Sequence, residues 1–136
     1  MKSSTRRQFI GQLSLSLPAV AIAGSVVNLA QKKQMFIHHV YFWLKNPDSK
    51  EDKTKLIEGL RRLSKVKTIK SFHIGQPATT NREVIDRSYS ISWCLFFDKA
   101  ADQDSYQSDP VHLKFVEDCS SLWSKVVVYD SVDIIP

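Results

Sequence analysis

The segment FIHHVYFWLK, residues 36–45, restricts the possible folds more than any other part of the chain. Its many β-branched and aromatic residues predict a strand rather than a solvated helix. Successive side chains of a strand point to opposite faces, and here both faces are largely apolar. One face carries His38, Val40, Phe42 and Leu44, and the other carries His39, Tyr41 and Trp43. Because one layer of helices covers only one face of a sheet, the second face predicts a partner subunit.

The remaining segments predict a four-stranded antiparallel sheet with helices on one side. After a turn at 46–48, a helix opens at Ser49, with Asp52 in the capping-box position, and ends near Val66. We further predict strands at 68–74, 89–97 and 125–134, a polar loop at 78–87, and a helix in two pieces at 100–108 and 110–122. The resulting βαββαβ order is the ferredoxin-like split unit, an α+β fold.

The break between the two helical pieces lies at Asp109-Pro110. Proline is tolerated in the first turn of a helix and not in its interior, so this pair predicts an N-cap and a first turn. The phenol of Tyr106 before the break and the imidazole of His112 after it then converge on one place. The spacing therefore selects these two residues as candidates for a functional site.

Tyr106 and His112 have two interpretations. A neutral imidazole accepts a proton near neutral pH and a phenol donates one to a developing enolate, so the pair fits acid–base catalysis with His112 as base. Alternatively, His112 caps the broken helix or bonds a backbone carbonyl, and Tyr106 is an amphipathic packing residue. The residues alone leave both interpretations open.

His38 and Asp130 form a second candidate pair. The first and last strands of a split βαβ sheet are antiparallel neighbours, so the start of one lies opposite the end of the other, on the helix side. The carboxylate would orient the imidazole on the floor of a pocket, or the two form a satisfied buried polar pair. The other predicted pocket residues, between sheet and helices, are Val40, Phe42, Trp93, Phe115 and Val128.

The face of the sheet away from the helices is predicted to form a dimer interface. Its predicted members are His39, Tyr41, Trp43, Val127 and Tyr129. An exposed apolar patch of this extent normally marks an interaction surface, and two such faces packed together form a dimeric α/β barrel. Adjacent strand residues such as His38 and His39 point apart, so we predict no metal site.

The first residues predict an export leader. Arg6 and Arg7 precede a modestly apolar stretch, residues 10–23, in a pattern that resembles a twin-arginine signal. Ala21-Ile22-Ala23 fits the small-residue cleavage rule, with a site after Ala30 as the alternative. The stretch is too short and too mildly hydrophobic to predict a stable membrane anchor.

We therefore expect a cleaved signal at 1–23, a flexible lead-in at 24–34 and one domain at 35–136, located in the bacterial periplasm or outside the cell. The formal net charge is +5, but Lys2, Arg6 and Arg7 belong to the leader. No basic run is interleaved with exposed aromatic residues, so nucleic acid is not an expected partner. Cys94 and Cys119 lie in apolar segments, which favours buried free thiols although export permits a disulfide.

Several segments, taken in order, match a known family. They are His38 to Lys45, Ile74-Gly75, Leu95-Phe96-Phe97-Asp98, Tyr106-x3-Pro110-x-His112 and Val126 to Asp130. Over about residues 36–132 the chain resembles the stress-responsive A/B-barrel (Dabb) family of dimeric α/β-barrel proteins. The resemblance implies a ferredoxin-like homodimer with a small pocket between the sheet and the helices.

The resemblance also bears on chemistry. Some plant relatives are cofactor-free polyketide cyclases, in which the tyrosine and histidine matching Tyr106 and His112 handle protons. This chain departs from the family at Asp109, where many members have His-Pro-x-His. It also has no tyrosine in the helix at 49–66, where the cyclases place a further pocket tyrosine.

These observations predict an exported homodimer that binds a small, partly apolar molecule, with no cofactor and no metal. The alternative is a cofactor-independent cyclase or lyase that uses Tyr106 and His112 for proton transfer. A further alternative is a heme or quinol monooxygenase of the same barrel architecture.

Overall fold

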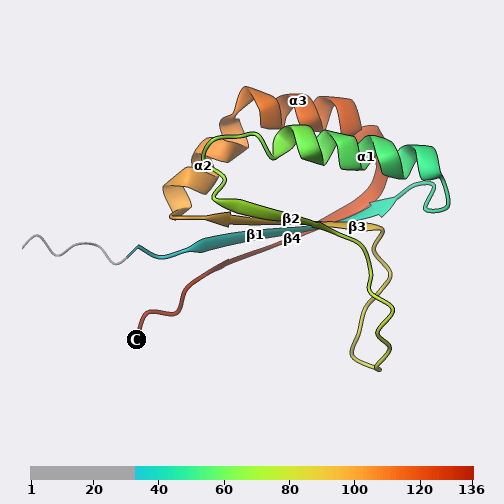
Figure 1. Ribbon diagram of the computed structural model, residues 1–136, viewed down its shortest axis with the longest axis horizontal. Coiled ribbons are helices and arrows are strands. Elements are labelled where there is room, and N and C mark those ends of the chain that lie inside the picture. The colour runs from blue at the N-terminus through green and yellow to red at the C-terminus, as the bar shows by residue number, and fades with distance from the viewer. Residues whose placement is uncertain (1–32) are drawn as a thin grey trace, which may run out of the picture. The chain divides into compact units, whose positions relative to one another are not determined.

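The computed structural model describes residues 33–136, and Figure 1 shows their arrangement. The strands are β1 (Phe36–Leu44), β2 (Ser71–Gly75), β3 (Ile91–Phe97) and β4 (Trp123–Val132). The helices are α1 (Lys50–Leu63), α2 (Ala100–Ser108), α3 (Pro110–Cys119) and a short 3₁₀ turn, η1 (Ser120–Leu122). The predicted βαββαβ order is confirmed. The predicted signal and most of the lead-in, with Arg6 and Arg7, lie outside the described residues.

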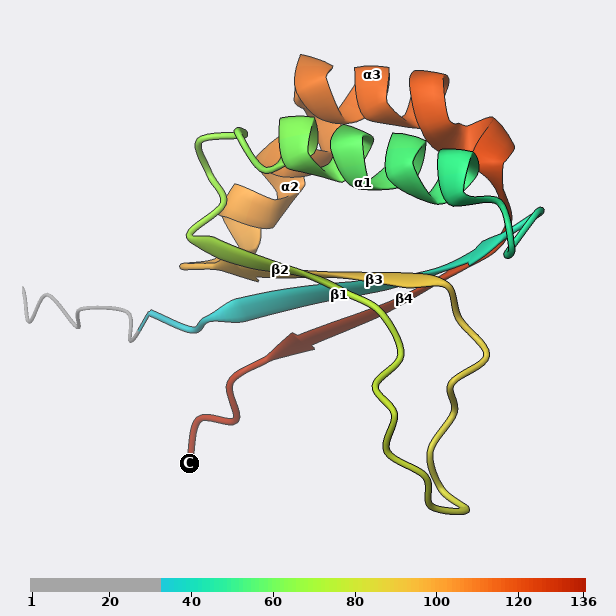
Figure 2. The same ribbon diagram turned by 45° about the vertical axis from the view of Figure 1, so that its right-hand side comes forward.

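The four strands form one antiparallel sheet in the order β2-β3-β1-β4. The two central strands, β1 and β3, are the ones whose helix-facing residues are most deeply buried. Among residues 33–136, all three α-helices cover the same face of this sheet, and none lies on the other face (Figures 1 and 2). The described domain is therefore a two-layer α+β unit with one open sheet face.

Local sequence explains where the helices begin. The Ser49 hydroxyl accepts a hydrogen bond from the Asp52 amide at 3.1 Å and caps α1. Asp109 ends α2 in an extended conformation and its carboxylate accepts from the Val111 amide at 2.8 Å, with Pro110 in the first turn of α3. The predicted break between the two helical pieces is thus observed, together with its cap.

The core lies between the sheet and the helices. Its largest buried side chains come from β3, α1 and α2, and they are Ile91, Trp93, Leu95, Phe97, Leu56, Leu60, Leu63 and Tyr106. α1 and α3 approach closely at Gly59, where a Cβ atom would lie 2.7 Å from the Cys119 sulfur. Only glycine fits this contact. Cys94 and Cys119 are both free, Cys119 buried beside Gly59 and Cys94 half-buried on β3.

Four predicted boundaries were wrong by two or three residues. α1 ends at Leu63, and β2 starts at Ser71 rather than 68, because residues 64–70 form successive turns in which the Val66 and Ile69 amides donate to the carbonyls of Leu63 and Val66. β3 starts at Ile91 rather than 89, and β4 runs two residues earlier than predicted. Propensity alone does not separate a turn rich in β-branched residues from a strand.

Alternation along the predicted strand at 89–97 places Tyr89 on the same face as Ile91 and Trp93, which is the helix side, and this is wrong. Its ring centroid lies 4.9 Å from that of Tyr41, on the open face. Strand alternation fails here because residues 76–90 form a long loop before β3 begins. Figure 2 shows this loop extending away from the sheet on the side opposite the helices. Within residues 33–136, no helix is long and apolar enough to span a membrane.

Candidate functional site

Four polar side chains from four different elements meet between the sheet and the helices. His38 comes from β1, Asp130 from β4, Tyr106 from α2 and His112 from α3. The ring centroids of His38 and Tyr106 are 5.9 Å apart, and those of Tyr106 and His112 are 4.7 Å apart. We call these four residues the His–Tyr–His–Asp cluster, and its middle member is Tyr106.

His38 and Asp130 are directly opposite each other in the β1–β4 ladder, as expected from the order of the strands. Their side chains are joined by a 2.6 Å contact between Nδ1 and Oδ1. His38 is only 5% exposed, whereas the Asp130 side chain is 45% exposed because β4 is an edge strand. A carboxylate on Nδ1 fixes the ring and directs Nε2 away from β4, as it does for histidine ligands and bases in general.

Tyr106 is 1% exposed and lies in the core. Its hydroxyl oxygen accepts a hydrogen bond from the Trp93 indole N–H at 3.2 Å. Burial raises the pKa of this phenol well above its ordinary value, and the Trp93 hydrogen bond only partly opposes that shift. The phenol therefore stays protonated, and its oxygen points toward Trp93.

His112 is half-buried, and its Nδ1 lies 3.1 Å from the Gln107 carbonyl oxygen. An N–H must donate to a carbonyl, so Nδ1 carries the proton and Nε2 is the unprotonated nitrogen of the neutral ring. The bond also satisfies a carbonyl at the end of α2 that the helix itself leaves unpaired. This is the contact that the structural interpretation of His112 predicted, and it leaves Nε2 unused.

Electrostatics keep His112 neutral. Burial lowers its pKa most, and the charge of His38 lowers it further, while the Gln107 carbonyl and Asp109 act in the opposite direction. The net direction is downward, so the ring is largely uncharged at neutral pH. A neutral, oriented imidazole with a free Nε2 is the form that a proton acceptor requires.

The apolar residues of the predicted pocket divide into two groups. Val40, Phe42 and Trp93 are exposed by 5% or less and Phe115 by 8%, so these four are core residues. Val128 is different, because it is paired with Val40 on the helix side of the sheet yet is 44% exposed. Its neighbour on the same side, Val126, is equally open. These two valines provide apolar surface along β4 on the same side of that strand as Asp130.

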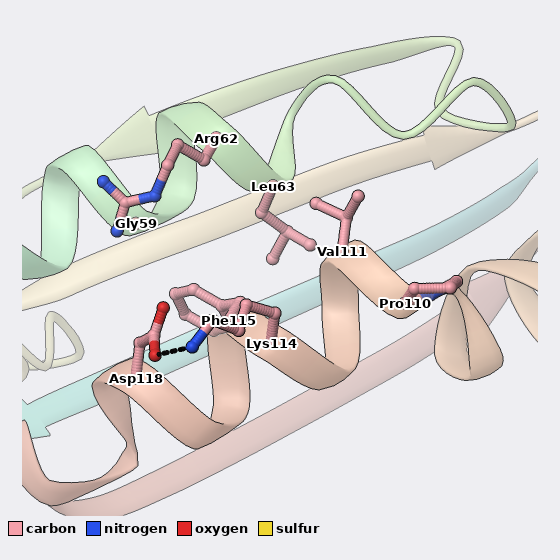
Figure 3. A pocket seen from close by; sticks show the side chains of 8 residues that line it. All are labelled: Gly59, Arg62, Leu63, Pro110, Val111, Lys114, Phe115 and Asp118. Atoms are coloured by element: carbon pink, nitrogen blue, oxygen red, sulfur yellow. Dashed lines mark hydrogen bonds and ion pairs between the residues drawn. The ribbon is translucent and has the colours of Figure 1, made fainter.

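Figure 3 shows a different cavity, a groove of about 260 Å³ between α1 and α3. Its lining includes Gly59, Leu63, Val111 and Phe115, with Arg62 and an ion-paired Lys114–Asp118 at its rim. Phe115 is the one predicted pocket residue in this lining. The groove therefore lies within the helical layer, apart from the His–Tyr–His–Asp cluster.

All five residues of the predicted dimer interface lie on the open face. The His39 ring stacks on Tyr41 with centroids 4.3 Å apart, and the Tyr41 ring meets Tyr129 edge-on at 6.0 Å. Tyr129 is 65% exposed. Burial, together with the charges of His73 and His38, lowers the pKa of His39. Among the described residues, no group of three or more His, Cys, Asp or Glu is arranged to hold a metal ion.

Sequence reasoning missed one of the hydrogen bonds that fix the cluster. The Trp93–Tyr106 bond joins a strand to a helix, and no local pattern signals it. The bond from His112 to a backbone carbonyl was expected, but its acceptor, Gln107, was not named. The one available signal was the helix break itself, since a helix that stops at Asp109 leaves carbonyls that a nearby donor can satisfy.

Residues 36–133 match the model of the stress-responsive A/B barrel domain. The chain belongs to this family. No curated protein shows a significant match to the chain. The similar solved structures agree with the assignment, since one is a Dabb family protein with a ferredoxin-like fold from Mesorhizobium loti. It shares 22% sequence identity with a TM-score of 0.63, and the match covers 74% of this chain and 98% of that one.

Two further structures extend the comparison. A dimeric ferredoxin-like protein from Thermobifida fusca has 15% identity and a TM-score of 0.60, covering 76% of this chain and 95% of its own. The hydroxynitrile lyase of Passiflora edulis has 19% identity and a TM-score of 0.62, covering 76% and 99%. At these identities the Dabb domain of this chain and the three proteins share a fold.

Proposed function

We propose that this Dabb domain binds a small, partly apolar molecule that carries a phenolic or enolic hydroxyl, at the His–Tyr–His–Asp cluster. One observation carries the proposal: two imidazoles, each fixed through Nδ1 by its own oxygen partner, flank the ring of Tyr106. In this tautomer Nε2 of each ring is unprotonated and accepts a hydrogen bond from a ligand hydroxyl. Buried polar atoms placed beside apolar surface are typical of small-molecule sites.

The surrounding surface supports this ligand class. Val126 and Val128 are exposed on the helix side of β4 and alternate along the strand with Asp130, so all three lie on the same face. Burying two such side chains against an apolar ligand contributes about 1 to 3 kcal/mol each. The ligand then has an apolar body along β4 and an oxygen directed at the imidazoles.

Thermal unfolding with a panel of small phenols and 1,3-diketones tests the proposal. Compounds that bind should raise the melting temperature of the wild type and of His73→Ala, a control that removes an exposed histidine on β2. The same compounds should have no effect on His112→Ala. If no compound shifts the wild type at millimolar concentration, the proposed binding site is wrong.

A second candidate is proton transfer, favoured by the neutral state of His112. In this scheme Nε2 of His112 removes a proton from a hydroxyl or an activated carbon of the ligand. In a lyase reaction on a cyanohydrin, the hydroxyl proton moves to His112, the C–CN bond breaks, and the cyanide leaves and takes up a proton. Tyr106 is placed for packing more than for acid catalysis, because its oxygen is directed to Trp93.

Mandelonitrile is the probe for this candidate, chosen because a hydroxynitrile lyase shares the fold. Release of benzaldehyde above the buffer rate, with a loss of about 10²-fold or more in His112→Ala, would support it. An equal rate in the variant would exclude His112 as the base. The monooxygenase alternative has its own test, since hemin added to the protein should give a shifted Soret band.

We also infer that two copies associate through their open sheet faces. Three of the similar structures are described as dimeric. The half-buried and exposed aromatic rings of Tyr41, Trp43 and Tyr129 give this face the composition of an interface core. Light scattering on the domain at several concentrations measures the state, and a strictly monomeric protein would contradict the inference.

Export remains a proposal based on the sequence. Arg6 and Arg7 precede the apolar stretch as a twin-arginine signal requires. Replacing both by lysine in a reporter fusion should keep the reporter inside the cell, while the unchanged leader delivers it to the periplasm. Delivery that is unaffected by the double lysine substitution would exclude this route.

A further inference from the structure

A cavity of about 320 Å³ lies between α1 and the end of β2, on the side of the sheet that the helices cover. We call it the α1–β2 pocket, and its lining consists of Lys53, Ile57, Arg61, Ile74, Gly75, Gln76 and Ile91. β2 and β4 are the two edges of the sheet, so this pocket lies at the edge opposite Asp130. It is therefore separate from the His–Tyr–His–Asp cluster and from the open sheet face.

Three isoleucines from three elements form the apolar part of the pocket. Ile91 of β3 is 1% exposed and belongs to the core, whereas Ile57 of α1 and Ile74 of β2 are half-buried. Ile74 is paired with the buried Trp93 in the β2–β3 ladder, which places it on the helix side of the sheet. Two isoleucines thus keep apolar surface that a ligand can cover.

The lining carries two positive charges and no negative one. Lys53 and Arg61 lie in one row on α1 with Ile57 between them, at intervals of four residues. Among residues 33–136, no carboxylate lies within ion-pair distance of either cation. Another lysine of the same helix is paired, since Lys55 contacts Glu51 at 2.8 Å. The positive charge of the pocket is therefore not balanced by a neighbouring side chain of this domain.

Lys53 is held at the pocket by a neutral partner. Its side chain is half-buried, and its Nζ donates to the side-chain oxygen of Gln76 at 2.9 Å. An ammonium group has three N–H donors, and an amide oxygen accepts one of them without bringing a charge. Gln76 thus positions the ammonium group without neutralising it, and two donors stay available to a ligand.

We propose that the α1–β2 pocket binds a small organic anion, a carboxylate carried on an apolar body. A mainly apolar lining with a few polar groups, at this volume, is typical of a small-molecule site. The ammonium of Lys53 and the guanidinium of Arg61 are the donors that bind carboxylates, the guanidinium through two parallel N–H bonds. A cation is repelled by both side chains, and a neutral ligand of equal shape lacks the charge-assisted bonds. The proposal is independent of the proposed function, which uses imidazoles at the other edge of the sheet.

4-Phenylbutyrate and its neutral isostere 4-phenylbutanamide form the matched pair of probes. The chain has four glycines, so glycine amide signals in ¹H–¹⁵N NMR are few, and Gly75 in the lining reports on the pocket. The carboxylate should shift the Gly75 signal in a saturable way at millimolar concentration and leave the imidazole signals of His112 unchanged. The amide should bind about threefold to tenfold more weakly, because its contacts with the two cations are not charge-assisted.

Two neighbouring arginines of α1 provide a matched control. Arg61→Gln removes a guanidinium from the lining and should weaken 4-phenylbutyrate binding about threefold to tenfold. Arg62→Gln removes the same charge from the next residue, which lines the groove between α1 and α3 instead, and should change binding by less than about twofold. Lys53→Met keeps a long side chain without its charge and should weaken binding as Arg61→Gln does.

Three results would overturn the proposal. Equal binding of the acid and the amide would show that the pocket does not recognise charge. Equal losses in Arg61→Gln and Arg62→Gln would show that the carboxylate responds to the overall positive charge of α1 rather than to the pocket. The absence of any saturable Gly75 shift in the wild type would show that the pocket takes no such ligand. None of these results bears on the His–Tyr–His–Asp cluster, whose test uses His112→Ala.

Discussion

Both faces of this sheet carry tryptophan and tyrosine side chains, but these are buried on one face and reached by water on the other. On the helix side, Trp93 and Tyr106 are almost completely buried, and their polar atoms bond each other. On the open side, Trp43 bonds Ser88 at a similar distance in a place that water reaches. A hydrogen bond of one geometry therefore has different energetic weight on the two faces. Where water cannot replace a lost partner, the loss is larger.

The largest expected difference between the faces concerns side-chain volume. Leu95→Ala removes a fully buried residue of β3 and should lower the free energy of unfolding by about 2 to 5 kcal/mol. Tyr129→Ala removes an exposed ring on the open face and should change the stability of the monomer by about 0.5 kcal/mol or less. Urea unfolding at low protein concentration measures both.

Measuring the same variants at higher protein concentration tests whether a second copy covers the open face. If two copies associate through the open faces, the wild-type melting temperature should rise with concentration, and Tyr129→Ala should reduce the rise. A melting temperature independent of concentration, together with a large loss for Tyr129→Ala at every concentration, would show that the open face stabilises the single chain. The prediction that side chains on the open face contribute little to the stability of the single chain would then be wrong.

The next prediction compares two indole N–H groups, each deprived of its oxygen acceptor. Tyr106→Phe strands the buried Trp93 N–H and should cost about 1 to 3 kcal/mol of stability. Ser88→Ala frees the exposed Trp43 N–H, which turns to water, and should cost about 0.5 kcal/mol or less. Denaturant unfolding of the two variants gives the values, and equal losses would contradict the comparison.

A smaller effect is expected from the cap between α2 and α3. Asp109→Ala removes the carboxylate that accepts from the Val111 amide and should cost about 0.5 to 2 kcal/mol, whereas Asp109→Ser should recover most of it. Because the cap sets the start of α3, the alanine variant should also disturb the His112–Gln107 bond. The imidazole ¹⁵N signals of His112 report on that bond, and signals unchanged in the alanine variant would show that the cap does not position the ring.

How much of this could be read from the sequence depends on the range of the interaction. The His38–Asp130 contact follows from strand order, and the Asp109 cap follows from the proline beside it, so both were predictable. The face of Tyr89 was not, because alternation applies only within a strand and the strand begins two residues later. The Trp93–Tyr106 bond and the contact between the Tyr41 and Tyr89 rings each join segments far apart in the chain. Their formation depends on packing distances that no local pattern contains.

The smallest expected effect concerns pH and one histidine from each face. His112 on the helix side and His39 on the open side both have a lowered pKa, in each case mainly because burial disfavours the charged ring. The folded state therefore binds fewer protons than the unfolded state. The contribution of each group is fully present above the ordinary pKa of 6.5 and is lost as pH falls through the folded value.

Urea unfolding between pH 7.5 and 5 should accordingly show falling stability, and His112→Gln and His39→Gln should each flatten part of the fall. The two faces separate when protein concentration is raised. An interface formed by the open faces buries His39 further, so its share of the pH dependence should grow with concentration, while that of His112 should stay constant. If both shares stay constant, His39 keeps its exposure in solution and the open face is not covered by a second copy. If the His112 share grows instead, the interface lies on the helix side, and the assignment of the two faces must be exchanged.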